Sequence, residues 1–234
     1  MSAPRRLGLR LLLLLALPAG ARAQQSLPAR LADRFQPAAS GVIGIADHRV
    51  DAGLGFERTS GLLLGVQVEA TPLEGTLLSV RALGGALGAH TPSTDARDVG
   101  EIAATARMRL VPWLDARAGL TTRTFTSSLA RQRWTSAAIG ADLRMTMLEG
   151  RLEGTAGAQL LPFVRVSGHE SPNASFGASM GLRYVARRYL VGLGYQLERY
   201  DFPSVADRRR LEEHTMLTLR AAYRFGRMTR ATAD

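Results

Sequence analysis

The chain has 234 residues, which is long enough for one β domain, and its composition argues against several classes of protein. It contains no cysteine, so neither disulfides nor cysteine metal ligands can hold it together. The formal net charge is +10, but along the strand-like segments the arginines are scattered singly and form no basic stripe. Nucleic acid is therefore not an expected partner, because it is bound by clustered basic residues.

The first 23 residues have the pattern of a secretory signal peptide. Arg5, Arg6 and Arg10 precede the apolar run 11–17, and a triplet of mostly small residues ends at Ala23. The apolar run is far shorter than the ~20 residues that a membrane-spanning helix needs. We therefore expect residues 1–23 to be removed after export through the general secretion pathway.

The apolar residues follow a two-residue period along most of the remaining chain. Residues 24–40 have a mixed composition and are expected to form a lead-in, and the period begins at residue 41. In the middle of the chain, for example, the alternation places Ile139 on an apolar face and Asp142 and Arg144 on a charged face. A period of two is that of a β-strand with two chemically different sides, so the pattern predicts an all-β protein.

The alternation divides the chain into about ten strands, although eight are also compatible with it. The predicted strands are 42–57, 62–71, 76–87, 99–110, 113–126, 134–147, 151–166, 174–185, 189–202 and 213–225. Short connections alternate with longer polar loops. The short ones are 72–75, 111–112, 148–150 and 186–188, and the longer ones are 89–98, 127–133, 167–173 and 203–212. This arrangement predicts antiparallel strands with tight turns at one end and longer loops at the other.

Aromatic residues gather near the predicted strand ends. Toward the short turns lie Tyr184, Tyr189, Tyr223 and Phe225. Toward the longer loops lie Phe56, Phe125, Trp134, Phe176, Tyr200 and Phe202. Aromatic rings settle at the depth of lipid headgroups, so this distribution predicts two interfacial girdles around a barrel that crosses a membrane.

The terminal strand, residues 217–225, alternates strictly and carries Tyr223 and Phe225 at its end. It resembles the signal by which the barrel-assembly machinery recognises small single-chain outer-membrane β-barrel proteins of Gram-negative-type bacteria. The resemblance covers residues 41–226 and leaves 227–234 as a tail. It implies an antiparallel, porin-like transmembrane barrel in the bacterial outer membrane, with short periplasmic turns and longer extracellular loops. Outer-membrane lipid and, during biogenesis, the assembly machinery are the partners that it implies.

The competing fold is a soluble β-sandwich or lipocalin-like barrel, whose strands also alternate. A soluble barrel places charge outside, whereas these strands combine small residues and lone arginines on one face, which suits a lumen. Glycine is costly inside a soluble sheet but recurs here within the predicted strands, as crowded barrel interiors require. These glycines are Gly53, Gly55, Gly140, Gly177, Gly181, Gly192 and Gly194.

The charged face predicts a network of acids and arginines inside the lumen. Its main members are Glu101, Arg107, Arg109, Asp115, Arg117, Asp142, Arg144, Glu153, Arg183 and Arg220, and Asp51 and Arg165 are expected on the same face. In a barrel of about ten strands such side chains can fill the interior. The favoured function is therefore a structural or loop-mediated interaction by a barrel with a charge-plugged lumen. A small passive pore that prefers anions is the alternative.

One segment suggests catalysis, although an enzyme is not the favoured interpretation. Residues 168–175 include His169 and Ser171, and they loosely resemble the histidine and serine of the outer-membrane lipid A deacylases. Pro172 interrupts that motif, and turn chemistry explains the same residues. The other histidines have no metal-ligand spacing and no cofactor motif is present, so neither a metal nor a cofactor is expected. The sequence identifies no extracellular partner.

Overall fold

A computed structural model describes residues 35–53, 55–90, 94–186, 188–205 and 208–225. The expected signal peptide, most of the lead-in and the tail lie outside these ranges. The described part forms ten strands: β1 Ala38–Asp51, β2 Phe56–Ala70, β3 Thr76–Ala89, β4 Arg97–Val111, β5 Leu114–Thr126, β6 Arg131–Met147, β7 Leu152–Val166, β8 Ala174–Ala186, β9 Tyr189–Val205 and β10 Arg208–Arg224. Among the helices of the described residues, none is long and apolar enough to cross a membrane.

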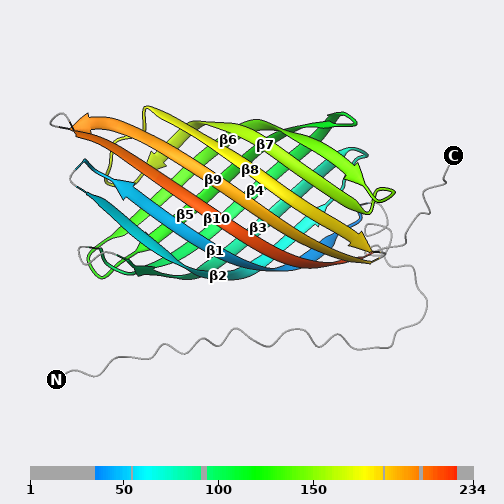
Figure 1. Cartoon of the computed structure of the whole chain (residues 1–234), viewed down its shortest axis with the longest axis horizontal. Helices are drawn as coiled ribbons and strands as arrows, with labels where there is room; N and C mark the ends of the chain where they lie inside the picture. Colours follow the sequence, from blue (N-terminus) through cyan, green and yellow to red (C-terminus); the bar gives the residue numbers. More distant parts are fainter. Residues whose placement is uncertain (1–34, 54, 91–93, 187, 206–207, 226–234) are drawn as a thin grey trace, which may run out of the picture.

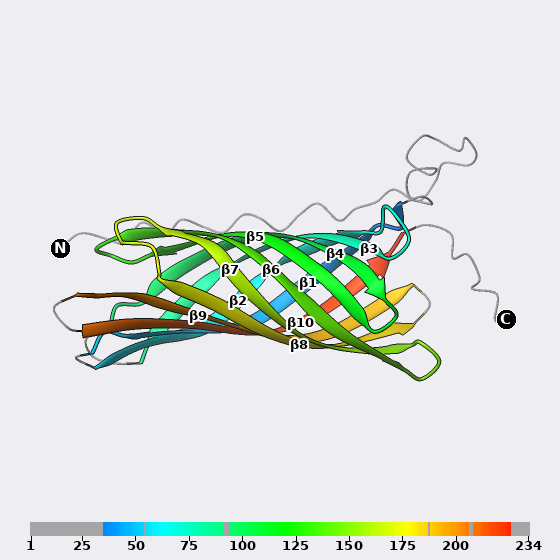
Figure 2. The ribbon, with the colours of Figure 1, turned by 90° about the horizontal axis from the view of Figure 1, so that it is seen from above.

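The strands close into one antiparallel barrel, as the alternation predicted. Each strand pairs with its neighbours in sequence, and β1 pairs with both β2 and β10. Ala38 lies opposite Glu69 on one side and Arg224 on the other. Figures 1 and 2 show the strands crossing the wall obliquely, with β1 beside β10. We call the end where β1 begins and β10 ends the proximal end, and the opposite end the distal end.

Apolar side chains cover the outer surface of the wall, and charged side chains point inward. Large apolar residues are exposed on every strand; Ile139, for example, is 55% exposed. One such residue from each strand, in chain order, gives Ile43, Leu64, Val80, Ile102, Leu120, Ile139, Leu160, Met180, Leu193 and Leu219. A soluble barrel would bury these residues, so the inside-out arrangement of a membrane barrel is confirmed.

The predicted boundaries of the first two strands were wrong. The predicted strand 42–57 runs across a turn, because β1 ends at Asp51 and β2 begins at Phe56. Gly53 and Gly55 lie in this turn with φ of 76° and 135°, values that favour glycine. They therefore serve chain reversal and not strand packing, and the turn is too short to interrupt the apolar alternation visibly.

The distal loops are shorter than expected because the strands continue past their predicted ends. β6 begins at Arg131, inside the predicted loop 127–133. β9 extends to Val205 and β10 begins at Arg208, so most of the predicted loop 203–212 is strand. Polar side chains on both faces hid these extensions from a pattern that searches for an apolar face.

A bulge in β7 reverses the orientation of the side chains that follow it. Ile139 pairs with Leu160 but Ala137 pairs with Phe163, so β7 has an extra residue beside Pro162. Beyond the bulge Val164 and Val166 are buried inside, and Arg165 points outward and is exposed. The prediction that Arg165 faces the lumen was therefore wrong, and Asp51 also lies exposed at the distal end.

Only part of the predicted aromatic distribution is found on the outer surface. At the proximal end Tyr184, Tyr189 and Phe225 are exposed, and Tyr223 packs between Tyr189 and Phe225, with ring centroids 5.7 and 5.1 Å away. At the distal end only Phe56 and Phe176 are exposed among the predicted members. The other four are buried inside the barrel: Phe125, Trp134, Tyr200 and Phe202.

Candidate functional site: the barrel lumen

An aromatic and aliphatic cluster fills the distal half of the lumen. Trp134 packs edge-on against Tyr200 and Phe202, with ring centroids 4.9 and 5.8 Å away. Phe125 stacks on His48 at 4.7 Å. All of these side chains are at most 4% exposed. We call this cluster the distal plug; its further apolar members are Val42, Ala46, Leu63, Leu83, Leu87, Val99, Leu161, Val164, Val166 and Met216.

A buried ion cluster lies at the base of the distal plug. Arg123 donates from Nε to Glu101 at 2.8 Å and from Nη1 to Glu198 at 3.1 Å. Arg81 donates to the other oxygen of Glu101 at 2.7 Å, and the Tyr200 hydroxyl donates to Glu198 at 2.7 Å. Arg123 and both glutamates are at most 3% exposed. Each buried carboxylate therefore has a cation and a further hydrogen bond, as burial of charge requires.

A second ionic group lies at the distal mouth. His48 Nε2 lies 3.0 Å from a carboxylate oxygen of Glu212, and Arg210 donates from Nε to the other oxygen at 2.8 Å. Arg97 approaches the Nδ1 atom of His48 at 3.4 Å and donates to Glu57 at 2.9 Å. These contacts join β1, β2, β4 and β10 across the lumen, so the mouth is crosslinked by side chains as well as by loops.

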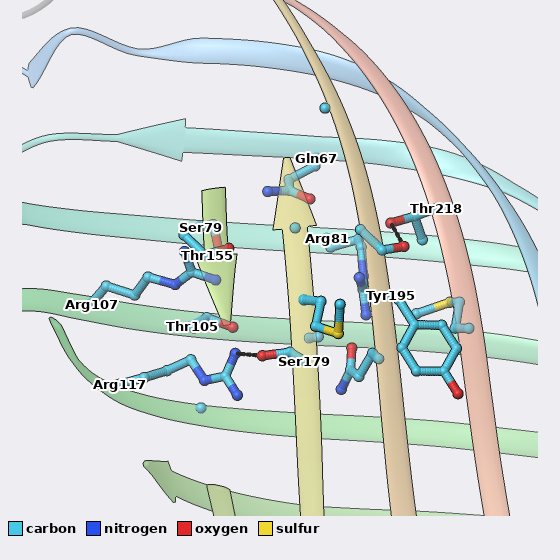
Figure 3. Close-up of a pocket in the computed structure, with 18 of the residues that line it drawn as sticks. Gln67, Ser79, Arg81, Thr105, Arg107, Arg117, Thr155, Ser179, Tyr195 and Thr218 are labelled. Atoms are coloured by element: carbon cyan, nitrogen blue, oxygen red, sulfur yellow. Dashed lines mark hydrogen bonds between the residues drawn. The ribbon is translucent and has the colours of Figure 1, made fainter. Parts of the chain in front are cut away.

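The proximal half of the lumen is hollow and polar. One cavity of about 210 Å³ lies below the plug and is bounded on its distal side by Leu161, Glu198 and Met216. A second cavity of about 140 Å³ lies at the proximal mouth. Glu69, Arg107 and other side chains line both, so the two cavities lie next to each other along the wall. In Figure 3 Arg81, Arg107 and Arg117 extend from the wall into this space, and Arg117 donates to Ser179 at 3.1 Å.

Most of the sequence-predicted lumen residues meet in this proximal half. Asp142 lies between Arg107 and Arg117, at 3.2 and 3.3 Å. Arg144 pairs with Asp115 at 2.5 Å. Two further pairs are Arg183 with Glu153 at 2.9 Å and Arg220 with Glu69. Glu101 lies higher, at the base of the distal plug, and pairs there with Arg81 and Arg123 at 2.7 Å each. Among the ten main members predicted for this network, all of which the structure describes, Arg109 alone forms no ion pair.

Glycines in the facing strands make room for these long side chains. A Cβ atom added at Gly157 would collide with the Asp142 carboxylate. A Cβ at Gly192 would lie 2.7 Å from the Nε atom of Arg220. Gly157 in β7 and Gly192 in β9 therefore have a packing reason, because each lies where a neighbouring strand directs a charged side chain along the wall.

His169 and Ser171 lie in the distal loop 167–173, where His169 contacts the ionic group of the distal mouth. The Nδ1 atom of His169 accepts a hydrogen bond from Arg210 at 3.1 Å. Partial burial and the neighbouring guanidinium of Arg210 lower the pKa of His169 below its ordinary value. In a hydrolytic triad an acid orients this nitrogen. The contact with Arg210 instead places a cation there, and the geometry gives no support to the hydrolase interpretation.

The sequence analysis expected Glu198 on the inward face but missed the distal plug. His48, His214 and Glu212 are all at most 2% exposed, and none was singled out as part of a site. Parity along the strands could have found the aromatic members, since Phe125 shares a face with Arg123, and Tyr200 with Glu198. In the part of the chain that the structure describes, no group of three or more histidine or acidic side chains could hold a metal ion.

No protein-family model and no curated protein matches the sequence. Solved structures do match the fold. The outer membrane protease OmpT from Escherichia coli has a TM-score of 0.55 at 10% identity, over 82% of this chain and 98% of OmpT. The translocator domain of the autotransporter NalP from Neisseria meningitidis has a TM-score of 0.45 at 12% identity, over 81% and 88%. Neisserial surface protein A has a TM-score of 0.38 at 10% identity, over 80% and 99%.

At 10% identity the likeness to OmpT extends to the fold and not to the activity. It agrees with the strand order, the closure between β1 and β10 and the exposed apolar outer face. The chain folds as a closed ten-stranded antiparallel β-barrel of the kind found in small bacterial outer-membrane proteins.

Proposed function

We propose that this protein resides in the bacterial outer membrane as a barrel closed to ions, and that it acts through its extracellular surface. The exposed apolar belt supports the membrane location, because soluble proteins rarely leave so large a contiguous apolar surface uncovered. The proximal end would face the periplasm and the distal end the outside. The observation that carries the closed state is the distal plug, in which rings and paired ions fill the lumen.

The working surface would be the distal ends of the strands, since the loops there are short. Beyond the apolar belt the strands carry outward-facing charged side chains, which we call the distal collar: Asp47, Arg49, Asp51, Arg58, Asp98, Arg131, Arg133, Arg165, Arg199, Asp201, Arg209 and Glu213. Arg58 pairs with Asp47 at 2.6 Å, and Arg209 with Asp201 at 2.5 Å. This part of the collar is electrically balanced and suits a polar partner.

The collar differs on the side formed by β6 and β7. Arg131, Arg133 and Arg165 lie opposite threonines in register, and within the described ranges none of the three has an acidic partner. They lie directly distal to the exposed Phe163. Unpaired guanidinium groups at that height suit the phosphate groups of lipid headgroups in the outer leaflet, which supports outer-membrane lipid as a partner.

We expect the purified, folded protein to show no stepwise conductance in planar lipid bilayers. We expect the plug to leave no continuous wet path, because its apolar rings and paired ions lie between the mouth and the proximal cavity. The measurement is single-channel recording at neutral pH. A matched variant should open the path: replacing Trp134, Tyr200 and Phe202 together by alanine removes the aromatic part of the plug.

Stable, ion-selective steps from the wild-type protein would contradict the closed state and favour the alternative of a passive pore. A preference for anions in those steps would then fit the arginines of the proximal lumen. Hydrolysis of a lipid substrate that is lost on His169→Ala would instead favour the hydrolase. Folding in each case is checked by electrophoresis with and without boiling, because a folded barrel migrates faster unheated.

We expect Tyr223 and Phe225 to determine insertion by the barrel-assembly machinery. Both rings lie on the outer face at the end of β10, and the backbone N–H of Phe225 donates to the carbonyl of Pro37 beside β1 at 2.9 Å. The variant Tyr223→Ala with Phe225→Ala should accumulate less folded barrel in outer-membrane fractions, measured by heat-modifiable migration.

The matched control is Trp113→Ala with Tyr184→Ala, which removes two exposed rings from the same end of the barrel but away from Tyr223 and Phe225. That control should insert nearly as well as wild type, and so should a chain that lacks residues 227–234. Equal insertion of both double variants would remove the reason for regarding the last strand as an assembly signal.

A further inference from the structure

The charges of the lumen are distributed unequally between its two halves. At the base of the plug, Arg81 and Arg123 balance Glu101 and Glu198. Below them seven arginines face the proximal cavities: Arg107, Arg109, Arg117, Arg144, Arg183, Arg220 and Arg224. The acids that pair with them are Glu69, Asp115, Asp142 and Glu153. The proximal half therefore has an excess of three positive charges.

The ion pairs show which arginines carry the excess positive charge. Asp142 serves two arginines, Arg107 and Arg117, so neither guanidinium is fully neutralised. Within the described part of the chain, neither Arg109 nor Arg224 forms an ion pair, and both line the 140 Å³ cavity at the proximal mouth. Arg109 lies opposite Asp115 in register, but Asp115 pairs with Arg144 at 2.5 Å. Arg107 lines the same cavity and the larger one above it. The unbalanced cations are therefore continuous from the mouth to the middle of the lumen.

Like charges at close range in a narrow, partly desolvated lumen repel one another, so an anion that bridges them is stabilised. Guanidinium groups match oxyanions particularly well because their N–H groups bind two oxygens at once. The mouth cavity lies at the proximal end, and in the closed barrel proposed above the distal plug blocks the other side. An anion could therefore enter and leave by the same end. Both cavities suit a small ion, since sites for drug-sized ligands occupy roughly 300–1,000 Å³.

We propose that the proximal half of the lumen is a blind binding pocket for a small, soluble oxyanion with two or more negative charges, of the phosphate type. Arg109 and Arg224 bind it at the mouth, and Arg107 and Arg117 extend the site inward. A multivalent anion is favoured over chloride because one bound ion satisfies several guanidinium groups. The site differs from a pore, since it has one entrance, and its occupation does not depend on conduction.

The test is isothermal titration calorimetry of sodium pyrophosphate into the full barrel in nanodiscs of zwitterionic phosphatidylcholine. We expect saturable binding of one anion per barrel, weakened by added sodium chloride. The variant Arg109→Gln with Arg224→Gln should bind at least about tenfold more weakly, because it removes two charge-assisted contacts. Neither arginine forms an ion pair, so the double variant leaves no acid without its cation and should fold. Arg109→Gln alone provides a milder change at the exposed mouth.

The matched control is Arg131→Gln with Arg133→Gln, which removes the same charge from the distal collar. It should leave pyrophosphate affinity unchanged. An absence of saturable binding, or an equal loss in the control variant, would overturn the proposal. A lipid headgroup is the other source of phosphate, so the titration is repeated in nanodiscs that contain phosphatidylglycerol. Equal pyrophosphate affinity in both lipids supports a soluble ligand. Binding that occurs only in the zwitterionic discs would mean that phosphatidylglycerol headgroups occupy the site, and it would overturn the proposal of a soluble ligand.

Discussion

Replacing Arg123 by methionine should lower the free energy of unfolding by about 3–5 kcal/mol, the cost of leaving a buried charge without its partner. Arg123 contacts Glu101 at 2.7 Å and Glu198 at 3.1 Å, and all three side chains are almost fully buried. Methionine keeps a similar length and apolar stem but removes the cation. The measurement is the urea dependence of folding in phospholipid vesicles, followed by tryptophan fluorescence.

Two further variants separate the buried charge from other effects. Arg58→Met breaks an exposed pair with Asp47 and should cost less than about 1 kcal/mol. Adding Glu198→Gln to Arg123→Met removes the carboxylate that has lost its cation, while Glu101 still has Arg81. The double variant should therefore be more stable than Arg123→Met alone. If Arg123→Met cost no more than Arg58→Met, the ion cluster would not be holding the plug in place.

The sequence predicted the fold because a membrane barrel repeats one simple rule along every strand. Ile139 and Leu143 on one face and Asp142 and Arg144 on the other were sufficient to orient β6, and the structure agrees. The rule fails where a bulge shifts the alternation by one residue, because side chains expected inside then point outward. The bulge beside Pro162 moved Arg165 to the outer face, and a bulge depends on pairing with a neighbouring strand, which alternation in one strand does not record.

The candidate site was less predictable than the fold. The alternation along each strand assigned the charged residues to the lumen. It does not give their position along the barrel axis, or which strand faces each of them across the interior. The contact of Arg123 in β5 with Glu198 in β9 depends on closure of the whole barrel. Aromatic residues near strand ends also have two possible roles, a girdle or a plug. Tyr200 and Phe202 were assigned to the girdle by their position along β9, and their parity with Glu198 decides for the plug.

Arginine introduced on the outer apolar face should destabilise the barrel in a way that depends on its depth. Ile139 is 55% exposed in the middle of β6, where the membrane interior would surround it. Ile139→Arg should cost about 2–4 kcal/mol in the free energy of unfolding, because the side chain must bring its charge into the hydrocarbon layer. The measurement is again urea unfolding in phospholipid vesicles, and Leu193→Arg in β9 tests the apolar face on another side of the barrel.

The control for depth lies on the same face of the same strand. Thr135 points outward near the distal end of the belt, where Arg165 is its partner in β7. Thr135→Arg adds the same charge at the height of the headgroups and should cost no more than about 1 kcal/mol. If Ile139→Arg folded into vesicles as stably as Thr135→Arg, while Arg144→Leu prevented folding, the assignment of the inner and outer faces relative to lipid would be inverted.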